Sequence, residues 1–297
     1  ADGRLLWRRK TGFAFSAGPV VAYGQLFAGT REGELVALSA DSGEVSWQAQ
    51  LGGEVLAPPV VEGDALVVKA TDGRVSLFER ADGKLRWVHD GGLPPLSLRA
   101  ASRPLLLVDG VVAGLPSGML VALDRATGQP VWERRVGEPS GKSELDRLVD
   151  VAGDIELAGN RLYAATFQGR LVALDLRNGQ FAWQQPLSTW QPLVAGNDDV
   201  CAVDADSRLQ CWRAEDGVVL WRLESLLGRQ LAGLAQYGPW LLAGDYQGWL
   251  HVIRRADGVI AGRVRVDRDG IAVAPVVDEG TVFVLGRGGK RAAVTLE

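Results

Sequence analysis

A repeated segment of about forty residues constrains the fold of this chain more than any other feature of its sequence. In five copies, two glycines stand ten residues apart around an alternating apolar run. These copies are Gly33–Gly43, Gly73–Gly83, Gly118–Gly128, Gly169–Gly179 and Gly248–Gly258, and Ser207–Gly217 is a sixth copy with serine in the first position. Repeats of this length are typical of solenoids and propellers.

Each copy is preceded by a pair of short apolar runs, such as Val20-Val21 followed by Leu26–Ala28. Period-two alternation broken by Gly, Asp and Asn is the signal of short strands joined by tight turns. Four such strands in every forty residues predict the blade of a β-propeller, because one four-stranded sheet needs neighbouring sheets to cover both of its faces. We therefore predict an all-β fold, a β-propeller of four-stranded antiparallel blades that forms a single domain over residues 1–297.

Tryptophan recurs in phase with the repeat, four residues after the second glycine. The tryptophans in this position are Trp7, Trp47, Trp87, Trp132, Trp183 and Trp221, whereas the Gly248–Gly258 copy has Gly262 there. We expect each of these rings to be buried as a wedge against the next blade. The tryptophans outside this phase are expected to be more exposed; they are Trp190, Trp212, Trp240 and Trp249.

Counting the repeats gives six full units between about residues 17 and 266, three further strands around 271–297, and a lone fourth strand at 3–10. About seven blades are therefore encoded. The chain opens inside a repeat, so strands from the two termini are candidates to close the last blade together.

Two insertions interrupt the repeat, at Gly91–Arg103 and at Gly137–Asp154. Both lie between the last strand of one blade and the first strand of the next, so both are expected on the same rim. Only Ser143–Val149, inside the second insertion, has a helical pattern. Loops that a rigid scaffold holds in place commonly carry binding residues, and we therefore expect the binding site there.

The inventory of chemical groups argues against catalysis. His89 and His251 each stand alone among strand residues, and no nucleophile, phosphate-loop or metalloprotease motif occurs. The pairs Asp204/Asp206 and Asp267/Asp269 have too few oxygen ligands for calcium and are interpreted as turn residues. With 32 basic and 36 acidic residues, the chain has no basic field for nucleic acid. No window of 18 apolar residues is present. We predict no catalytic residues, no metal site and no enzyme activity.

Cys201 and Cys211 fall on consecutive predicted strands of one blade. They either face each other and form a disulfide or remain buried thiols; the spacing allows both.

The segments Ala122–Trp132 (ALDRATGQPVW) and Ala173–Trp183 (ALDLRNGQFAW) resemble the tryptophan-docking motif of the pyrroloquinoline-quinone propeller superfamily. One branch of that superfamily is the quinoprotein alcohol dehydrogenases, which carry a disulfide between adjacent cysteines and acidic calcium ligands. No adjacent cysteine pair occurs in this chain, and no cofactor is predicted.

The segment Leu96–Arg99 together with Ser143–Val151 closely resembles the outer membrane protein assembly factor BamB family, and the similarity extends over essentially the whole chain. The resemblance implies a lipid-anchored protein on the periplasmic side of the bacterial outer membrane. It implies binding to the periplasmic domains of BamA, and a role in inserting outer-membrane β-barrels. It also implies eight blades in an intact member, in which case Trp7 marks the fourth strand of a first blade whose earlier strands are missing.

Residues that match the partner-binding set of this family are Leu96, Leu98, Arg99 and Asp150. A second acid often follows two residues after the aspartate, but Ala152 occupies that position here. The two leucines either form an exposed apolar patch or hold their loop down, and Arg99 either pairs with Asp150 or contacts the partner. We expect Asp150 to lie near the Leu96–Arg99 loop.

Two other functions remain open at this point. One is a quinoprotein dehydrogenase, supported only by the docking motif. The other is a propeller that binds peptide or carbohydrate, with Trp240 or Trp249 as the platform.

Overall fold

The computed structural model describes residues 5–93, 102–138, 142–143 and 148–296. In that part of the chain all regular secondary structure is β-strand, and no helix there has the length and hydropathy that a membrane span requires. The chain divides into two compact units, residues 1–152 and 153–297, which are described separately.

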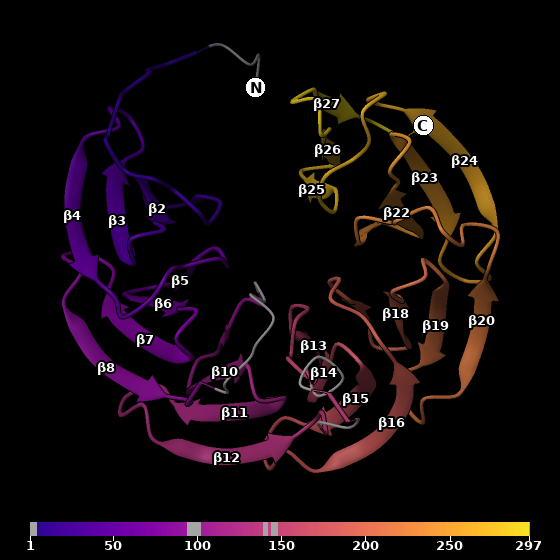
Figure 1. Cartoon of the computed structure of the whole chain (residues 1–297), viewed down its shortest axis with the longest axis horizontal. Helices are drawn as coiled ribbons and strands as arrows, with labels where there is room; N and C mark the ends of the chain where they lie inside the picture. Colours follow the sequence, from indigo (N-terminus) through magenta and orange to yellow (C-terminus); the bar gives the residue numbers. More distant parts are fainter. Residues whose placement is uncertain (1–4, 94–101, 139–141, 144–147, 297) are drawn as a thin grey trace. The chain divides into compact units, whose positions relative to one another are not determined.

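The first unit contains three four-stranded antiparallel sheets, each in the strand order of the sequence (Figure 1). The first sheet is β1 (Val20–Ala22), β2 (Gln25–Gly29), β3 (Glu34–Ser39) and β4 (Val45–Gln50). The second is β5 (Val60–Glu62), β6 (Ala65–Lys69), β7 (Arg74–Glu79) and β8 (Leu85–Asp90). The third is β9 (Leu105–Leu106), β10 (Gly110–Gly114), β11 (Met119–Asp124) and β12 (Pro130–Arg135).

The second unit contains three four-stranded sheets and one three-stranded sheet. The fourth sheet of the chain is β13 (Glu156–Ala158), β14 (Arg161–Ala165), β15 (Gly169–Asp175) and β16 (Phe181–Leu187). The fifth is β17 (Val194–Ala195), β18 (Asp199–Val203), β19 (Leu209–Arg213) and β20 (Val219–Leu223). The sixth is β21 (Leu234–Tyr237), β22 (Trp240–Gly244), β23 (Trp249–Arg254) and β24 (Ile260–Arg265). The seventh is β25 (Val276–Asp278), β26 (Thr281–Leu285) and β27 (Arg291–Val294). The predicted six full units and three further strands are confirmed.

The docking tryptophans explain why the repeat needs both its tryptophan and its second glycine. Trp47 on β4 donates its indole N–H to the carbonyl of Arg80 in the next sheet, over 3.0 Å. Its ring lies against Gly83, where a Cβ would clash with it. Gly83 also has a φ of 72°, which only glycine adopts without strain. Trp47 therefore joins the first sheet to the turn between the third and fourth strands of the second sheet.

The same indole-to-carbonyl bond recurs along the chain. It joins Trp7 to Ala40, Trp87 to Arg125, Trp183 to Ala214 and Trp221 to Arg255. Trp132, the sixth predicted wedge, is buried with 7% of its surface exposed. Apolar clusters fill the space between neighbouring sheets within each unit; in one of them Phe27 and Leu35 of the first sheet pack with Leu66 and Phe78 of the second.

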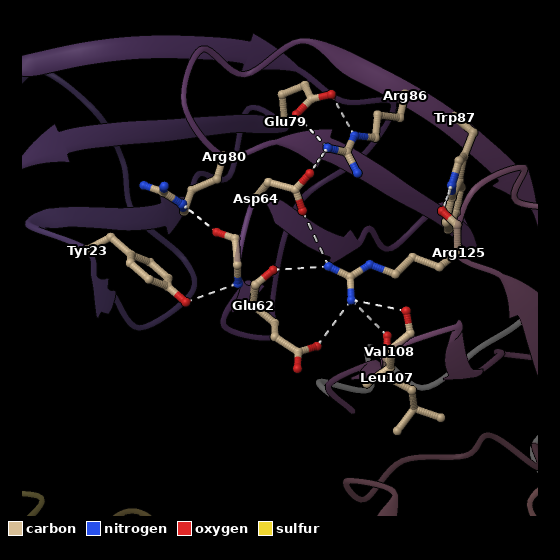
Figure 2. A network of polar contacts seen from close by, with 11 residues as sticks. Tyr23, Glu62, Asp64, Glu79, Arg80, Arg86, Trp87, Leu107, Val108 and Arg125 are labelled. Carbon is tan, nitrogen blue, oxygen red and sulfur yellow. Dashed lines mark hydrogen bonds and ion pairs between the residues drawn. The ribbon is translucent and has the colours of Figure 1, made fainter.

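Polar side chains tie the sheets of the first unit together at the turns that follow their third strands (Figure 2). Arg125, after β11, reaches back to the second sheet and contacts the Glu62 carboxylate at 3.4 Å and the Asp64 carboxylate at 3.5 Å. Arg80 is the equivalent residue after β7; it donates to the carbonyl of Gly63 and lies over the ring of Tyr23 in the first sheet. The arginine in each of these turns therefore has two roles. Its backbone carbonyl accepts the indole N–H of a tryptophan, and its side-chain cation contacts the preceding sheet.

Two details differ from the sequence prediction. Residues 5–10 do not form the expected fourth strand, because no strand in the described part of the chain pairs with them; Trp7 nevertheless docks on the first sheet. Trp212 is 1% exposed rather than more exposed, because on β19 it takes the buried position that Phe78 has on β7. Trp190 is 47% exposed, as expected.

Candidate partner-binding site

The first insertion ends beside the turn between β10 and β11. Ser102, at the end of that insertion, is 1% exposed and accepts a hydrogen bond from the Lys69 ammonium. The same ammonium donates to the carbonyl of Gly114 over 3.0 Å. Lys69 is itself only 7% exposed, so its positive charge lies inside the protein at the end of β6. This lysine anchors the returning end of the first insertion to the third sheet.

The second insertion ends against the same turn. Val151 packs on Gly114, so closely that a Cβ on that glycine would clash with the valine. The carbonyl of Val149 lies as closely against Gly118, which has a φ of 72°. Ser102 is the other side chain near Gly114. The returning ends of both insertions therefore meet at the β10–β11 turn, on one rim of the third sheet.

The structure places the predicted binding residues unevenly. Leu96, Leu98 and Arg99 lie outside the described residues, so their exposure and the expected proximity of Asp150 to their loop remain predictions. Asp150 is described and is 1% exposed, and Ala152 beside it is 7% exposed. Residues 148–150 are not helical. Asp150 is thus a buried acid within a loop end, where a surface charge was expected.

Burial changes what Asp150 can do. Removing a carboxylate from water is costly unless charges or hydrogen bonds compensate, and Lys69 is a second buried charge close to the same turn. Nothing in the sequence singled out Lys69 beyond its place after an apolar strand.

The other groups that the sequence raised have structural partners. Asp204 accepts the backbone N–H groups of Asp206 and Arg208 in the β18–β19 turn. Asp267 accepts those of Asp269 and Gly288, so the interpretation of both aspartates as turn residues is confirmed. Cys201 and Cys211 face each other across β18 and β19 and form a disulfide, which decides the alternative that the sequence left open.

A buried polar cluster in the sixth sheet was missed. The Asp245 carboxylate is fully buried and accepts hydrogen bonds from Arg229 at 2.7 Å, from His251 Nε2 at 2.9 Å, and from the backbone N–H groups of Gln247 and Trp249. Burial lowers the pKa of His251 despite the nearby carboxylate. Burial pushes the pKa of Asp245 upward, but the bonds from His251, Trp249 and Arg229 outweigh it and leave that pKa lowered. His251 is therefore a hydrogen-bonded structural histidine.

Repeated four-stranded antiparallel blades, clasped by tryptophans that dock on the next blade, define this chain as a β-propeller. Known structures agree. The chain matches the crystal structure of BamB from Moraxella catarrhalis with a TM-score of 0.90 and 27% identity, over 98% of this chain and 88% of that one. It matches a europium-containing methanol dehydrogenase with a TM-score of 0.68 and 15% identity, over 92% of this chain and 71% of that one, which shows the fold alone.

The sequence comparisons identify the family within this class. Residues 1–223 match the family model described as outer membrane protein assembly factor BamB. Among relatives of that name, the Shewanella oneidensis protein is 33% identical over 100% of this chain and 78% of its own length. The Burkholderia pseudomallei protein is 34% identical, over 97% of this chain and 75% of its own length. The chain belongs to the outer membrane protein assembly factor BamB family.

Proposed function

We propose that this chain is a non-catalytic scaffold of the machinery that assembles outer-membrane β-barrels, and that it binds the periplasmic domains of BamA. Relatives at 30–34% identity carry the name of outer membrane protein assembly factors, which supports a role in that process. The proposal places the intact protein on the periplasmic side of the outer membrane, held by a lipid anchor.

One observation carries the assignment of the binding surface. The ends of the two insertions meet at Gly114, so both loops belong to one rim. An interface of standard size buries roughly 800 Å² on each partner, which one loop alone does not supply. Two loops anchored at a single turn supply a larger surface whose shape the rigid sheets maintain.

Charge and size changes in the first loop test the surface. We expect Leu96→Glu, Leu98→Glu and Arg99→Glu each to weaken binding to purified BamA periplasmic domains by at least about tenfold, as loss of an interface anchor does. Matched controls are Val108→Glu, at a valine that is 77% exposed, and Arg177→Glu, at a side chain that is 80% exposed. Undiminished binding by all three loop variants overturns the site assignment.

Asp150 tests whether the second loop shares the interface. Because the carboxylate is buried, we expect Asp150→Ala to lower the free energy of unfolding by about 1–3 kcal/mol. We also expect slower association with BamA and a flatter salt dependence, because a charge near the partner is lost. Binding is measured at a temperature where the variant is fully folded. A loss of stability with unchanged binding refutes a role in the interface.

A direct assay tests the absence of catalysis. The purified protein is incubated with pyrroloquinoline quinone and calcium, and then examined for a bound chromophore and for dye-linked alcohol oxidation. We expect neither signal. A stoichiometric chromophore together with turnover contradicts the scaffold proposal and favours the dehydrogenase branch of the fold.

A further inference from the structure

The second unit contains a pocket of about 380 Å³ beside the sixth sheet. One wall is the loop before β21, with Ser225, Leu226 and Arg229, and another is the exposed edge strand β24 from Ile260 to Arg263. His251 lines the pocket from β23. None of these residues belongs to the partner-binding rim of the first unit, so the pocket is a separate feature of the molecule.

His251, a lining residue of this pocket, has an unused hydrogen-bond acceptor that is buried in the unliganded protein. Its side chain is 1% exposed, and Nδ1 is buried without a hydrogen-bond partner anywhere in the described part of the chain. The other ring nitrogen, Nε2, lies 2.9 Å from the Asp245 carboxylate. An ionised carboxylate only accepts, so Nε2 carries the proton and Nδ1 of the neutral ring has a free lone pair. Asp245 thus fixes which nitrogen is left open.

Arg263 adds a positive charge on the same face of the sheet. It is the direct cross-strand partner of His251, and such pairs project to the same side. Its guanidinium lies over the Trp249 ring, 4.4 Å from the centroid, and it has no carboxylate partner among the described residues. Arg229, 2.7 Å from Asp245, is a second guanidinium in the lining. The charge of Arg229 is compensated by Asp245, so Arg263 is the uncompensated cation among the described residues of the lining, and a guanidinium favours an anion over a metal cation.

The fifth sheet shows what a closed version of this pair looks like. Gln210 and Arg222 occupy the positions of His251 and Arg263, and Arg222 Nε donates to the Gln210 side-chain oxygen at 2.8 Å. In that pair the side-chain acceptor and the cation bond to each other. In the sixth sheet the matching pair leaves both an acceptor and a cation available for something else.

We propose that this pocket binds a small oxyanion that carries its own hydroxyl proton, namely hydrogen phosphate or the singly protonated form of a phosphomonoester group. Its charged oxygens accept hydrogen bonds from Arg263 and Arg229, and its P–OH group donates to His251 Nδ1. The ligand is defined by needing both an anionic oxygen and a donor. The inference does not rest on the proposed function, because its residues lie in another unit and its test uses no partner protein.

Imidazole NMR gives a direct test, because the chain has only two histidines. The ¹⁵N spectrum of the protein, assigned with a His89→Gln variant, is expected to show His251 as the Nε2–H tautomer. Titration with inorganic phosphate at constant pH and ionic strength is expected to shift the His251 Nδ1 signal saturably and leave His89 unchanged. Absence of a saturable His251 shift overturns the proposal.

Sulfate tests the donor requirement, because it has nearly the charge and shape of phosphate but no proton near neutral pH. We expect sulfate to bind at least about tenfold more weakly, the cost of leaving a buried acceptor unpaired. Equal binding of sulfate overturns the assignment of Nδ1. Glycerol 3-phosphate and vesicles that contain phosphatidic acid then distinguish a free phosphomonoester from a lipid headgroup.

A matched pair of arginine variants tests the cation. Arg263→Gln is expected to weaken phosphate binding at least about fivefold, because a charge-assisted hydrogen bond is lost. Arg265→Gln removes the same charge from the same strand but lies outside the pocket lining, and binding is expected to stay within about twofold of the unaltered chain. Equal losses in both variants mean general charge attraction and overturn the site.

Discussion

The second and third strands of the fifth and sixth sheets pair in the same register, but different residues occupy the middle of that pair. In the fifth, Cys201 on β18 and Cys211 on β19 are covalently joined. In the sixth, Leu242 and Val252 take the same paired positions. The fifth sheet ends in the docking Trp221, whereas the sixth has Gly262 at that position.

The two turns between the second and third strands differ in the same way. Asp204 and Asp245 each accept two backbone N–H groups of their own turn. The second oxygen of Asp204 pairs with Arg208 at 3.0 Å, partly in solvent, whereas that of Asp245 holds Arg229 and the buried His251. The repeat therefore fixes the backbone and leaves the side-chain centre of each sheet free to acquire separate chemistry.

The largest contrast is expected between the two turn aspartates. Asp245→Ala strips a fully buried carboxylate from two cationic or polar partners, and we expect a loss of about 3–5 kcal/mol in the free energy of unfolding. Asp204→Ala removes an equivalent but more accessible group and is expected to cost about 1–2 kcal/mol. Urea denaturation of the two variants makes the measurement. Equal losses contradict the distinction between the turns.

Removing the disulfide of the fifth sheet is expected to have the next largest effect. The loop it closes is short, with a sequence separation of 10, so Cys201→Ala combined with Cys211→Ala should lower stability by about 2–3 kcal/mol. Thiol titration of the unfolded parent protein provides the control: two thiols are expected only after reduction. Free thiols without reductant contradict the crosslink.

The buried histidine predicts an acid-sensitive stability specific to the sixth sheet. Burial lowers the folded-state pKa of His251 below its ordinary 6.5, so the unfolded chain binds more protons as pH falls below that value. Stability is therefore expected to decline from pH 6.5 toward the lower folded pKa, by up to about 1.4 kcal/mol per pH unit. Asp245, whose folded pKa is also lowered, adds a further decline only below its ordinary 3.8, as pH falls toward the folded value. The test is urea unfolding across pH 4–8: His251→Gln should remove the slope in the upper range, and His89→Gln should keep it. A slope that both variants retain contradicts the assignment.

The smallest change in stability is expected at Gly262, which stands where the other four-stranded sheets have the docking tryptophan. Gly262 does not have a left-handed φ, and a Cβ there meets nothing within 4 Å, so Gly262→Ala should stabilise the strand by about 0.5–1 kcal/mol. Gly258, in the same sheet, has a φ of 74° and lies against the Trp221 ring, so Gly258→Ala should destabilise the protein. Thermal melts should show a higher melting temperature for Gly262→Ala and a lower one for Gly258→Ala. A lower melting temperature in both variants contradicts the conclusion that Gly262 has room for a side chain.

Much of the fold could be predicted because the repeat encodes local backbone rules. A glycine with positive φ after each third strand and a tryptophan four residues later, such as Gly83 and Trp87, define both the turn and the packing of the next strand. Strand formation at residues 5–10 could not be predicted in this way, because a strand depends on a hydrogen-bonding neighbour as well as on its own pattern. The burial of Trp212, by contrast, could have been predicted from the repeat, because Trp212 aligns with apolar third-strand residues such as Leu123 and Ile253.

The candidate sites were harder to predict, because burial of polar groups depends on contacts between distant segments. Asp150 carries a charge at a loop end, and the sequence alone does not show that the loop folds over it. Lys69 bonds to Ser102 from 33 residues away. His251 is linked to Arg229 through Asp245, and this link depends on the path of a turn rather than on any spacing in the sequence.

The hydrogen bond from each docking indole to the next sheet has a consequence for how such a chain can change over evolutionary time. The acceptor is always a backbone carbonyl, supplied by alanine at positions 40 and 214 and by arginine at positions 80, 125 and 255. Since every residue type offers that same group, the indole bond does not depend on which side chain stands at the accepting position, provided that the tryptophan and the glycine remain. The accepting position can therefore change its side chain without loss of this bond, and the centre of each sheet can diverge separately, as the fifth and sixth sheets show.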